Sequence, residues 1–193
     1  MNMSVRDYKN GRLLYHITSI QNLPSILKEG LLPRNQRKPV VDVADQEILT
    51  GRAKHGLDSM VPFHFFADNP FDGRVQKDHP QETFVFIGIP RTHANSNNWK
   101  ISAKHPLNGE FELLDYAKGI ETIDWDAMNA RDYTTREGKS VCMAECLSPK
   151  AVSANDFQQI FVKSDQDKQT VEAMLRDFGI KCWVNTNTHM FAN

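Results

Sequence analysis

The alternation of apolar and polar runs along the chain predicts several short strands mixed with three or four helices. Residues 11 to 18 form an apolar run that is typical of a buried strand. A short helix should follow, because Asn22 can cap it, Pro24 suits its first turn and Gly30 can end it. The clearest strand pattern is the apolar run at residues 83–91.

The same kind of pattern predicts the other strands, helices and loops of the chain. Further strands are expected at residues 60–66, where Pro62 indicates a sheet edge or a strand start, around Trp99 and Ile101, at 159–163 and at 180–184. Helices are expected at residues 44–55, at 123–131, and from Ser164 or Asp165 to Gly179. Turn-rich residues at 33–43, 68–81 and 133–139 are expected to form loops. Because no regular βαβ order is present, the pattern predicts an α+β fold.

The length of 193 residues fits one domain spanning residues 1–193. No window approaches the roughly 18 apolar residues that a membrane span needs, so we expect no membrane partner. Residues 1–10 lack the apolar core of a secretory signal, and the expected location is therefore cytoplasmic.

The three cysteines are expected to be reduced, because an odd number without an export signal argues against a disulfide framework. Cys142 and Cys146 are spaced like metal ligands on a helix. No second cysteine pair or nearby histidine completes a set of four ligands. We therefore expect no metal, and instead expect both cysteines to act as small buried hydrophobic residues.

The net charge of −1 gives the chain no overall attraction to a polyanion, so nucleic acid would have to be held by local basic clusters. Three clusters are candidates: Arg34, Arg37 and Lys38; Lys100, Lys104 and His105; and Arg131, Arg136 and Lys139. For each cluster the alternative is a solvated protein surface.

Glu145 is the residue that departs most from the hydrophobic pattern. It lies within the apolar run from Val141 to Leu147. A carboxylate among so many apolar neighbours is costly to bury unless it is paired or takes part in chemistry. Glu145 is therefore either the partner of an arginine or part of an active site.

Several short motifs follow one another along the chain. They are Leu14-Tyr15-His16-Ile17-Thr18, then Asn22-Leu23 with Ile26-Leu27 and Gly30, then Arg52, Val61-Pro62-Phe63-His64-Phe65-Phe66, Ile123-Asp124-Trp125 and Ala144-Glu145. In this order they resemble the DarT family of DNA ADP-ribosyltransferase toxins. The similarity spans roughly residues 13 to 163, and several motifs in one order are far more specific than any one alone.

The resemblance implies an ADP-ribosyltransferase (PARP-like) fold, with split mixed and antiparallel β-sheets and flanking helices. It also implies an enzyme, a glycosyltransferase that uses NAD as co-substrate and releases nicotinamide. Because breaking the bond to nicotinamide builds positive charge on the ribose C1 atom, the family's catalytic glutamate, here Glu145, would orient the sugar and stabilise that charge. The resemblance further assigns Arg52 to catalysis and to NAD binding, with His16, Ile17, Thr18, Ser25 and Pro33 as other NAD contacts.

We interpret Arg52 as an anchor, because a guanidinium with a pKa above about 12 rarely accepts a proton from another group. It would hold the NAD pyrophosphate or stabilise negative charge on the acceptor base. The alternatives are structural. Arg52 would be an exposed cation at a helix end, His16 a core histidine satisfied by a backbone carbonyl, and Glu145 a buried ion-pair partner.

The implied acceptor is a base of single-stranded DNA, since a base edge is hidden in paired DNA. By resemblance His105 and Lys139 would contact the DNA, and either could equally be a surface residue. Tyr133, Phe66 and Trp125 are candidates for stacking on bases, although Trp125 fits a core position better.

Two departures from the family pattern bear on the acceptor base. The chain has Cys146-Leu147-Ser148-Pro149 where many members have an aromatic and β-branched strand, and the segment from Asn129 to Lys139 is short. Both resemble the guanine-modifying branch more than the thymine-modifying branch. The resemblance also implies a cognate antitoxin, an ADP-ribose hydrolase of macrodomain or similar type. Two other functions stay open: an ADP-ribosyltransferase acting on RNA or protein, and a nucleic-acid-binding module without catalysis.

Overall fold

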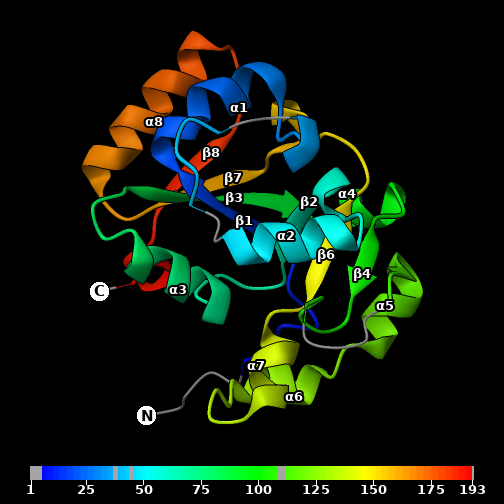
Figure 1. The fold of residues 1–193 in the computed structure, drawn as a ribbon. Coiled ribbons are helices and arrows are strands. Elements are labelled where there is room, and N and C mark those ends of the chain that lie inside the picture. Colours follow the sequence, from blue (N-terminus) through cyan, green and yellow to red (C-terminus); the bar gives the residue numbers. More distant parts are fainter. Residues whose placement is uncertain (1–5, 37–38, 44–45, 108–111, 193) are drawn as a thin grey trace.

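A mixed β-sheet of eight strands forms the centre of the molecule (Figure 1). The computed structural model describes residues 6–36, 39–43, 46–107 and 112–192. The strands follow the spatial order β5-β4-β6-β2-β1-β3-β7-β8, with β7 and β8 parallel and the other neighbours antiparallel. They are β1 (Leu13–Ser19), β2 (Val61–His64), β3 (Phe84–Pro90), β4 (Lys100–Ser102), β5 (Leu114–Asp115), β6 (Glu145–Ser148), β7 (Gln159–Val162) and β8 (Trp183–Thr186).

The sheet is weakly joined between β1 and β2. Only Tyr15 and His64 are in register across this junction, whereas all seven residues of β1 have a partner on β3. Across the same junction, His16 Nδ1 lies 2.8 Å from the carbonyl oxygen of Pro62. The eight strands therefore form one sheet that is nearly divided between β1 and β2, in agreement with the split sheets that the resemblance implies.

Pro62 lies on an interior strand, because β2 is flanked by β6 and β1. The expectation of a sheet edge is wrong, and the alternative of a strand start fits its second position in β2. A proline is tolerated here because the sparse pairing of β2 with β1 requires few backbone donors on that side.

Helices cover both ends of the sheet. In Figure 1, α1 and α8 pack together at the top, α6 and α7 lie at the bottom, and α2 crosses in front of β1 and β2. The α-helices are α1 (Leu23–Glu29), α2 (Gln46–Lys54), α3 (Pro70–Asp78), α4 (Arg91–Ser96), α5 (Tyr116–Thr122), α6 (Trp125–Ala130), α7 (Arg136–Cys142) and α8 (Asp165–Asp177). Short 3-10 turns are η1 (Ile20–Asn22), η2 (Arg34–Gln36), η3 (Leu57–Ser59), η4 (Ala154–Asp156) and η5 (Thr188–Met190).

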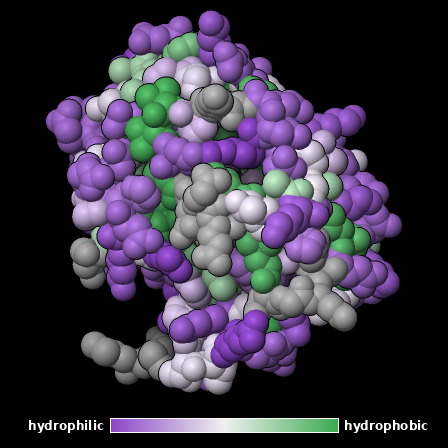
Figure 2. Space-filling model, in the orientation of Figure 1, coloured by the Kyte–Doolittle hydropathy of each residue, from purple (hydrophilic) through white to green (hydrophobic). Residues whose placement is uncertain are grey.

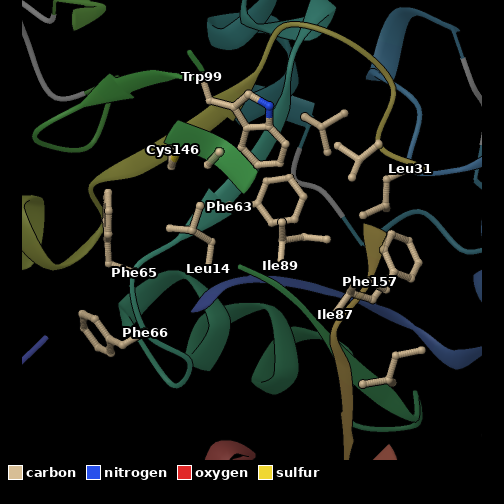
Figure 3. Packing of buried hydrophobic residues seen from close by; sticks show 14 of the residues in the cluster. Leu14, Leu31, Phe63, Phe65, Phe66, Ile87, Ile89, Trp99, Cys146 and Phe157 are labelled. Atoms are coloured by element: carbon tan, nitrogen blue, oxygen red, sulfur yellow. The ribbon is translucent and has the colours of Figure 1, made fainter. Parts of the chain in front are cut away.

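The main hydrophobic core joins the sheet to these helices (Figure 3). At its centre the rings of Phe63 and Trp99 are 5.0 Å apart, and Ile89 lies beside them. Outside the core, Figure 2 shows hydrophilic residues over most of one face, with hydrophobic residues visible near its middle. Within the described ranges, no helix is long and apolar enough to cross a membrane.

Several predicted elements are confirmed. Gly30 ends α1 with a φ of 85°, a conformation that glycine adopts without strain. The Ser164 side chain accepts the backbone N–H of Asp167 and begins α8. The strands at 11–18, 60–66, 83–91 and 159–163 also form, as β1, β2, β3 and β7. The mixture of strands and helices confirms the α+β class.

Other elements differ from the prediction. Residues 68–81 contain α3, because the Asn69 side chain accepts the N–H groups of Phe71 and Asp72 and Pro70 begins the helix. The predicted loop at 133–139 is half helix, since the Thr135 hydroxyl caps α7. The last strand begins at 183 instead of 180, and α4, α5 and β5 were not predicted. Among the predicted residues, Arg37, Lys38 and Ala44 lie outside the described part of the chain.

Candidate active site

A cleft opens at the weak junction between β1 and β2 and contains most of the predicted site residues. With its open mouth it spans about 1220 Å³ of empty space, part of which is open to solvent. The walls come from β1, α2, β2, β6 and the segments at 31–34 and 39–43. Its polar and charged lining residues include His16, Thr18, Asn22, Arg52, His64, His105 and Glu145.

Arg52 and Glu145 meet inside this cleft from α2 and β6. Arg52 Nη1 lies 2.8 Å from Oε1 and 2.9 Å from Oε2 of Glu145, and only 12% and 5% of the two side chains are exposed. The other terminal nitrogen of Arg52, Nη2, is buried without a hydrogen-bond partner in the described structure. A buried guanidinium donor without a partner is costly, so this nitrogen is available to an acceptor that a ligand supplies.

Two histidines flank this ion pair. His64 pairs with Glu145 across the ladder between β2 and β6, and its Nδ1 lies 3.3 Å from the carbonyl oxygen of Ala144. Burial lowers the pKa of His64 and of His105 below the ordinary value of 6.5, although the Glu145 carboxylate raises both. Burial thus favours the neutral form of both rings.

The predicted NAD contacts are placed in two groups. His16, Ile17 and Thr18 line the cleft from the end of β1. Ser25 and Pro33 are not among its lining residues: the Ser25 hydroxyl donates to the Asn22 carbonyl, and Pro33 is buried beside the segment that forms one wall. The structural alternative for His16 is also met, because its ring contacts a backbone carbonyl while lining the cleft.

A second groove adjoins the cleft at His105, which lines both. Lys139 lies in this groove together with Arg136, and both side chains are exposed on α7. The Ser140 hydroxyl is buried there without a hydrogen-bond partner in the described structure. The groove therefore presents positive charge and a spare polar group next to the Arg52–Glu145 pair.

The predicted stacking residues lie elsewhere. The Tyr133 hydroxyl lies 2.5 Å from Arg131 Nε, and the Arg131 guanidinium covers the rings of Tyr133 and Phe66. Phe66 is stacked on Tyr8 at 4.3 Å, and Trp125 is a core residue. Tyr133, the only one of the three that is half-exposed, lines neither the cleft nor the groove.

His64 and Asn22 are polar residues of the cleft that sequence reasoning did not assign to the site. His64 stands within the aromatic motif at 61–66, but only the pairing of β2 with β6 places it against Glu145. Asn22 was expected to cap α1, yet its side chain makes no capping bond and reaches the segment at 39–43 instead. Within the described ranges, no group of three or more His, Cys, Asp or Glu residues could hold a metal ion. Cys142 ends α7 and Cys146 lies on β6, both as free buried thiols.

Known proteins resemble the chain in sequence and in fold. A curated DNA ADP-ribosyl transferase from Thermus sp. (strain 2.9) is 26% identical over 194 residues, covering 90% of this chain and 91% of the relative. The structure of Thermus sp. 2.9 DarT in complex with ADP-ribosylated ssDNA superposes with a TM-score of 0.86 at 22% identity, covering 97% of this chain and 99% of that one.

The same protein in complex with NAD+ gives a TM-score of 0.79 at 20% identity, covering 95% and 98% of the two chains. Thermosipho africanus DarTG in complex with ADP-ribose gives 0.73 at 21% identity, covering 93% of this chain and 51% of that one. These structures share the fold. The family model described as ssDNA thymidine ADP-ribosyltransferase, DarT, matches residues 15–192, and the chain belongs to that family.

Proposed function

We propose that the protein transfers ADP-ribose from NAD to a base of single-stranded DNA and releases nicotinamide. One observation carries the proposal: a buried carboxylate, Glu145, is held by Arg52 inside the cleft beside His16 and Thr18. Membership of the DarT family supports the same activity. The resemblance that identified these residues in the sequence supports it independently of the geometry.

Glu145 suits the role of stabilising the transition state. Arg52 Nη1 approaches both of its oxygens, so each oxygen keeps a lone pair for a ribose hydroxyl. The bond between ribose C1 and nicotinamide breaks with its electron pair leaving on nicotinamide, and the positive charge on C1 is opposed by the carboxylate. A nitrogen of the acceptor base then bonds to C1 and loses its proton to solvent.

Arg52 serves as a donor of hydrogen bonds in this proposal. Its buried Nη2 would bind the NAD pyrophosphate or an oxygen of the acceptor base, as a planar guanidinium does well. His16, Ile17 and Thr18 would hold the nicotinamide ribose and the amide from the end of β1. Ser25 and Pro33 are proposed as NAD contacts on the resemblance alone.

The acceptor strand is proposed to follow the groove that meets the cleft at His105. Lys139 would bind phosphate, and His105 would contact the base that enters the cleft. Tyr133 remains a proposed DNA contact because an aromatic ring can stack on a base, here through a ring held in place by Arg131. The departures at 146–149 and the short segment between α6 and α7 favour guanine, whereas the family description names thymidine.

Modification of DNA bases blocks replication, so the proposal extends to a toxin with a cognate antitoxin that removes ADP-ribose. The experiment is to incubate the purified protein with NAD and single-stranded oligonucleotides that differ only in base composition. Addition of one ADP-ribose to oligonucleotides containing guanine, with release of nicotinamide, is expected. Modification of thymine oligonucleotides alone would reverse the base preference, and labelling of RNA or protein in place of DNA would contradict the proposal.

A further inference from the structure

Asn22 connects the first helix to the opposite wall of the cleft. Its side chain is buried, with 2% exposed, at the start of α1. Asn22 Nδ2 donates to the Val41 carbonyl at 3.0 Å, and Asn22 Oδ1 accepts the Val41 N–H at 3.0 Å. The side-chain amide thus pairs with one backbone residue in both directions. Since a carbonyl only accepts and an N–H only donates, the pairing also fixes the orientation of the amide.

Residues 39–43 form the wall that this pairing holds in place. Pro39, Val41, Asp42 and Val43 all line the cleft. Asn22 Nδ2 also lies 3.2 Å from Thr18 Oγ1, so one amide links the wall to the end of β1. The position of Val41 relative to Thr18 therefore depends on Asn22.

A second, more exposed contact holds the same segment. The Arg34 guanidinium donates to both carboxylate oxygens of Asp42, and 34% and 43% of these side chains are exposed. An exposed ion pair is screened by water and contributes little, whereas a buried amide pairing loses its full strength if one partner is removed. Asn22 is therefore the contact that determines where the wall lies.

We propose that Asn22 is a positioning residue for NAD, which holds residues 39–43 in the place that the bound dinucleotide requires. This inference rests on the proposed function, because it assigns the cleft to NAD. Both polar atoms of the Asn22 amide are engaged by the protein, so its effect passes through Val41 and Thr18 and not through the reacting atoms. A preformed wall lowers the cost of binding, since the ligand does not have to order it.

Asn22→Asp provides a sharp test, because aspartate has the same shape as asparagine. Its carboxylate accepts the Val41 N–H but has no proton for the Val41 carbonyl, whereas the protonated acid supplies that donor. Burial raises the pKa of such a carboxyl above its ordinary value. Binding of carba-NAD+ by the variant should therefore be about tenfold weaker than that of the wild type at pH 8 and should recover as the pH falls toward 5.5.

The wild type, titrated over the same pH series, removes the effect of groups common to both proteins. These are the titratable and charged groups that line the cleft, namely His16, Arg34, Asp42, His64, His105 and the Arg52–Glu145 pair. Asn155→Asp, an exposed asparagine in η4, is the matched control and should bind as the wild type at every pH. Equal affinity of Asn22→Asp and the wild type across the series would overturn the inference.

Asn22→Ala separates a local change from a loss of folding. Hydrogen exchange should become faster at residues 39–43, with the protection of α8 unchanged. With saturating NAD and the DNA acceptor, kcat should stay within about threefold of the wild type while KM for NAD rises. A fall in kcat with constant KM would contradict a positioning role. Failure of the wild type itself to bind carba-NAD+ would overturn the proposed function, whereas wild-type binding with unchanged exchange in the variant would overturn only the inference.

Discussion

Nη1 of Arg52 donates hydrogen bonds to both carboxylate oxygens of Glu145, while Nη2 of Arg52 is buried without a hydrogen-bond partner in the described structure. The usual arrangement for such a pair uses two parallel bonds from two nitrogens. Here one nitrogen holds the carboxylate and the other remains for a ligand. The pair is therefore the buried ion pair that the sequence allowed, and it keeps one donor that the proposed active site can use.

Glu145→Gln should separate catalysis from folding. The amide keeps the shape of the side chain and can still accept from Arg52, but it no longer opposes positive charge on the ribose C1 atom. We expect ADP-ribose transfer to fall by about 10²- to 10³-fold, with the affinity for carba-NAD+ within about threefold of the wild type. Mass spectrometry of the oligonucleotide and calorimetry measure the two effects. Glu121→Gln, an exposed glutamate on α5, is the control, and retained transfer in Glu145→Gln would remove Glu145 from catalysis.

Arg52→Ala should destabilise the protein because it leaves the Glu145 carboxylate buried without its cation. Breaking a buried pair in this way typically costs about 3–5 kcal/mol. The double variant Arg52→Ala with Glu145→Gln should regain part of that loss, since the remaining side chain is neutral. Chemical denaturation of the four proteins in this cycle gives the coupling energy. Additive effects of the two substitutions would mean that the contact contributes nothing to stability.

Local pattern predicted β1 and α2, which line the cleft, but not β6, the strand that carries Glu145. The apolar run at 11–18 predicted β1, and the helix that follows it ends at Gly30 as expected. The order of the motifs predicted that Arg52 and Glu145 belong to one site, although they are 93 positions apart in the sequence. These predictions succeeded because periodicity and end signals are local, and because the motifs contribute to one cleft.

What the sequence did not predict depends on contacts made through space. Asn22 has the residue type of a helix cap, but its side-chain amide is hydrogen-bonded to the backbone of Val41 and makes no capping bond. Tyr133 has the residue type of a stacking platform, but Arg131 occupies its hydroxyl and one face of its ring. In each case the local preference was reasonable, and a partner distant in the fold determined how the side chain is used. Helix α3 was missed for a different reason, since its signal is a single cap at Asn69 in a polar segment.

Lys139→Gln should weaken binding of single-stranded DNA without affecting NAD. The side chain is exposed in the groove beside His105, where it would neutralise a phosphate. Loss of one phosphate contact should reduce the slope of log affinity against log salt by about 0.7. Fluorescence anisotropy at several salt concentrations measures this slope. Lys181→Gln, an exposed lysine before β8 at the other end of the molecule, should leave it unchanged, and equal slopes for both variants would exclude Lys139 from the DNA path.

Asp72 makes the stability of the protein depend on pH. The residue is 1% exposed on α3, where Asn69 Nδ2 donates to Oδ2 at 2.7 Å and Oδ1 has no hydrogen-bond partner within the described structure. Burial raises the pKa of this carboxyl well above its ordinary value of 3.8. The folded protein therefore binds the proton more tightly than the unfolded chain does. The stabilisation is complete below about pH 3.8 and is lost as the pH rises through the folded-state pKa.

Asp72→Asn should remove the loss of stability at high pH, because the amide cannot ionise and still offers an oxygen to Asn69. At pH 8 we expect the variant to be more stable than the wild type by about 1–3 kcal/mol, and we expect the difference to shrink as the pH falls toward 4. Urea denaturation at several pH values measures both curves. Asp78→Asn, an exposed aspartate at the end of the same helix, is the control. A difference between Asp72→Asn and the wild type that stays constant from pH 4 to 8 would mean that Asp72 keeps its ordinary pKa in the folded protein.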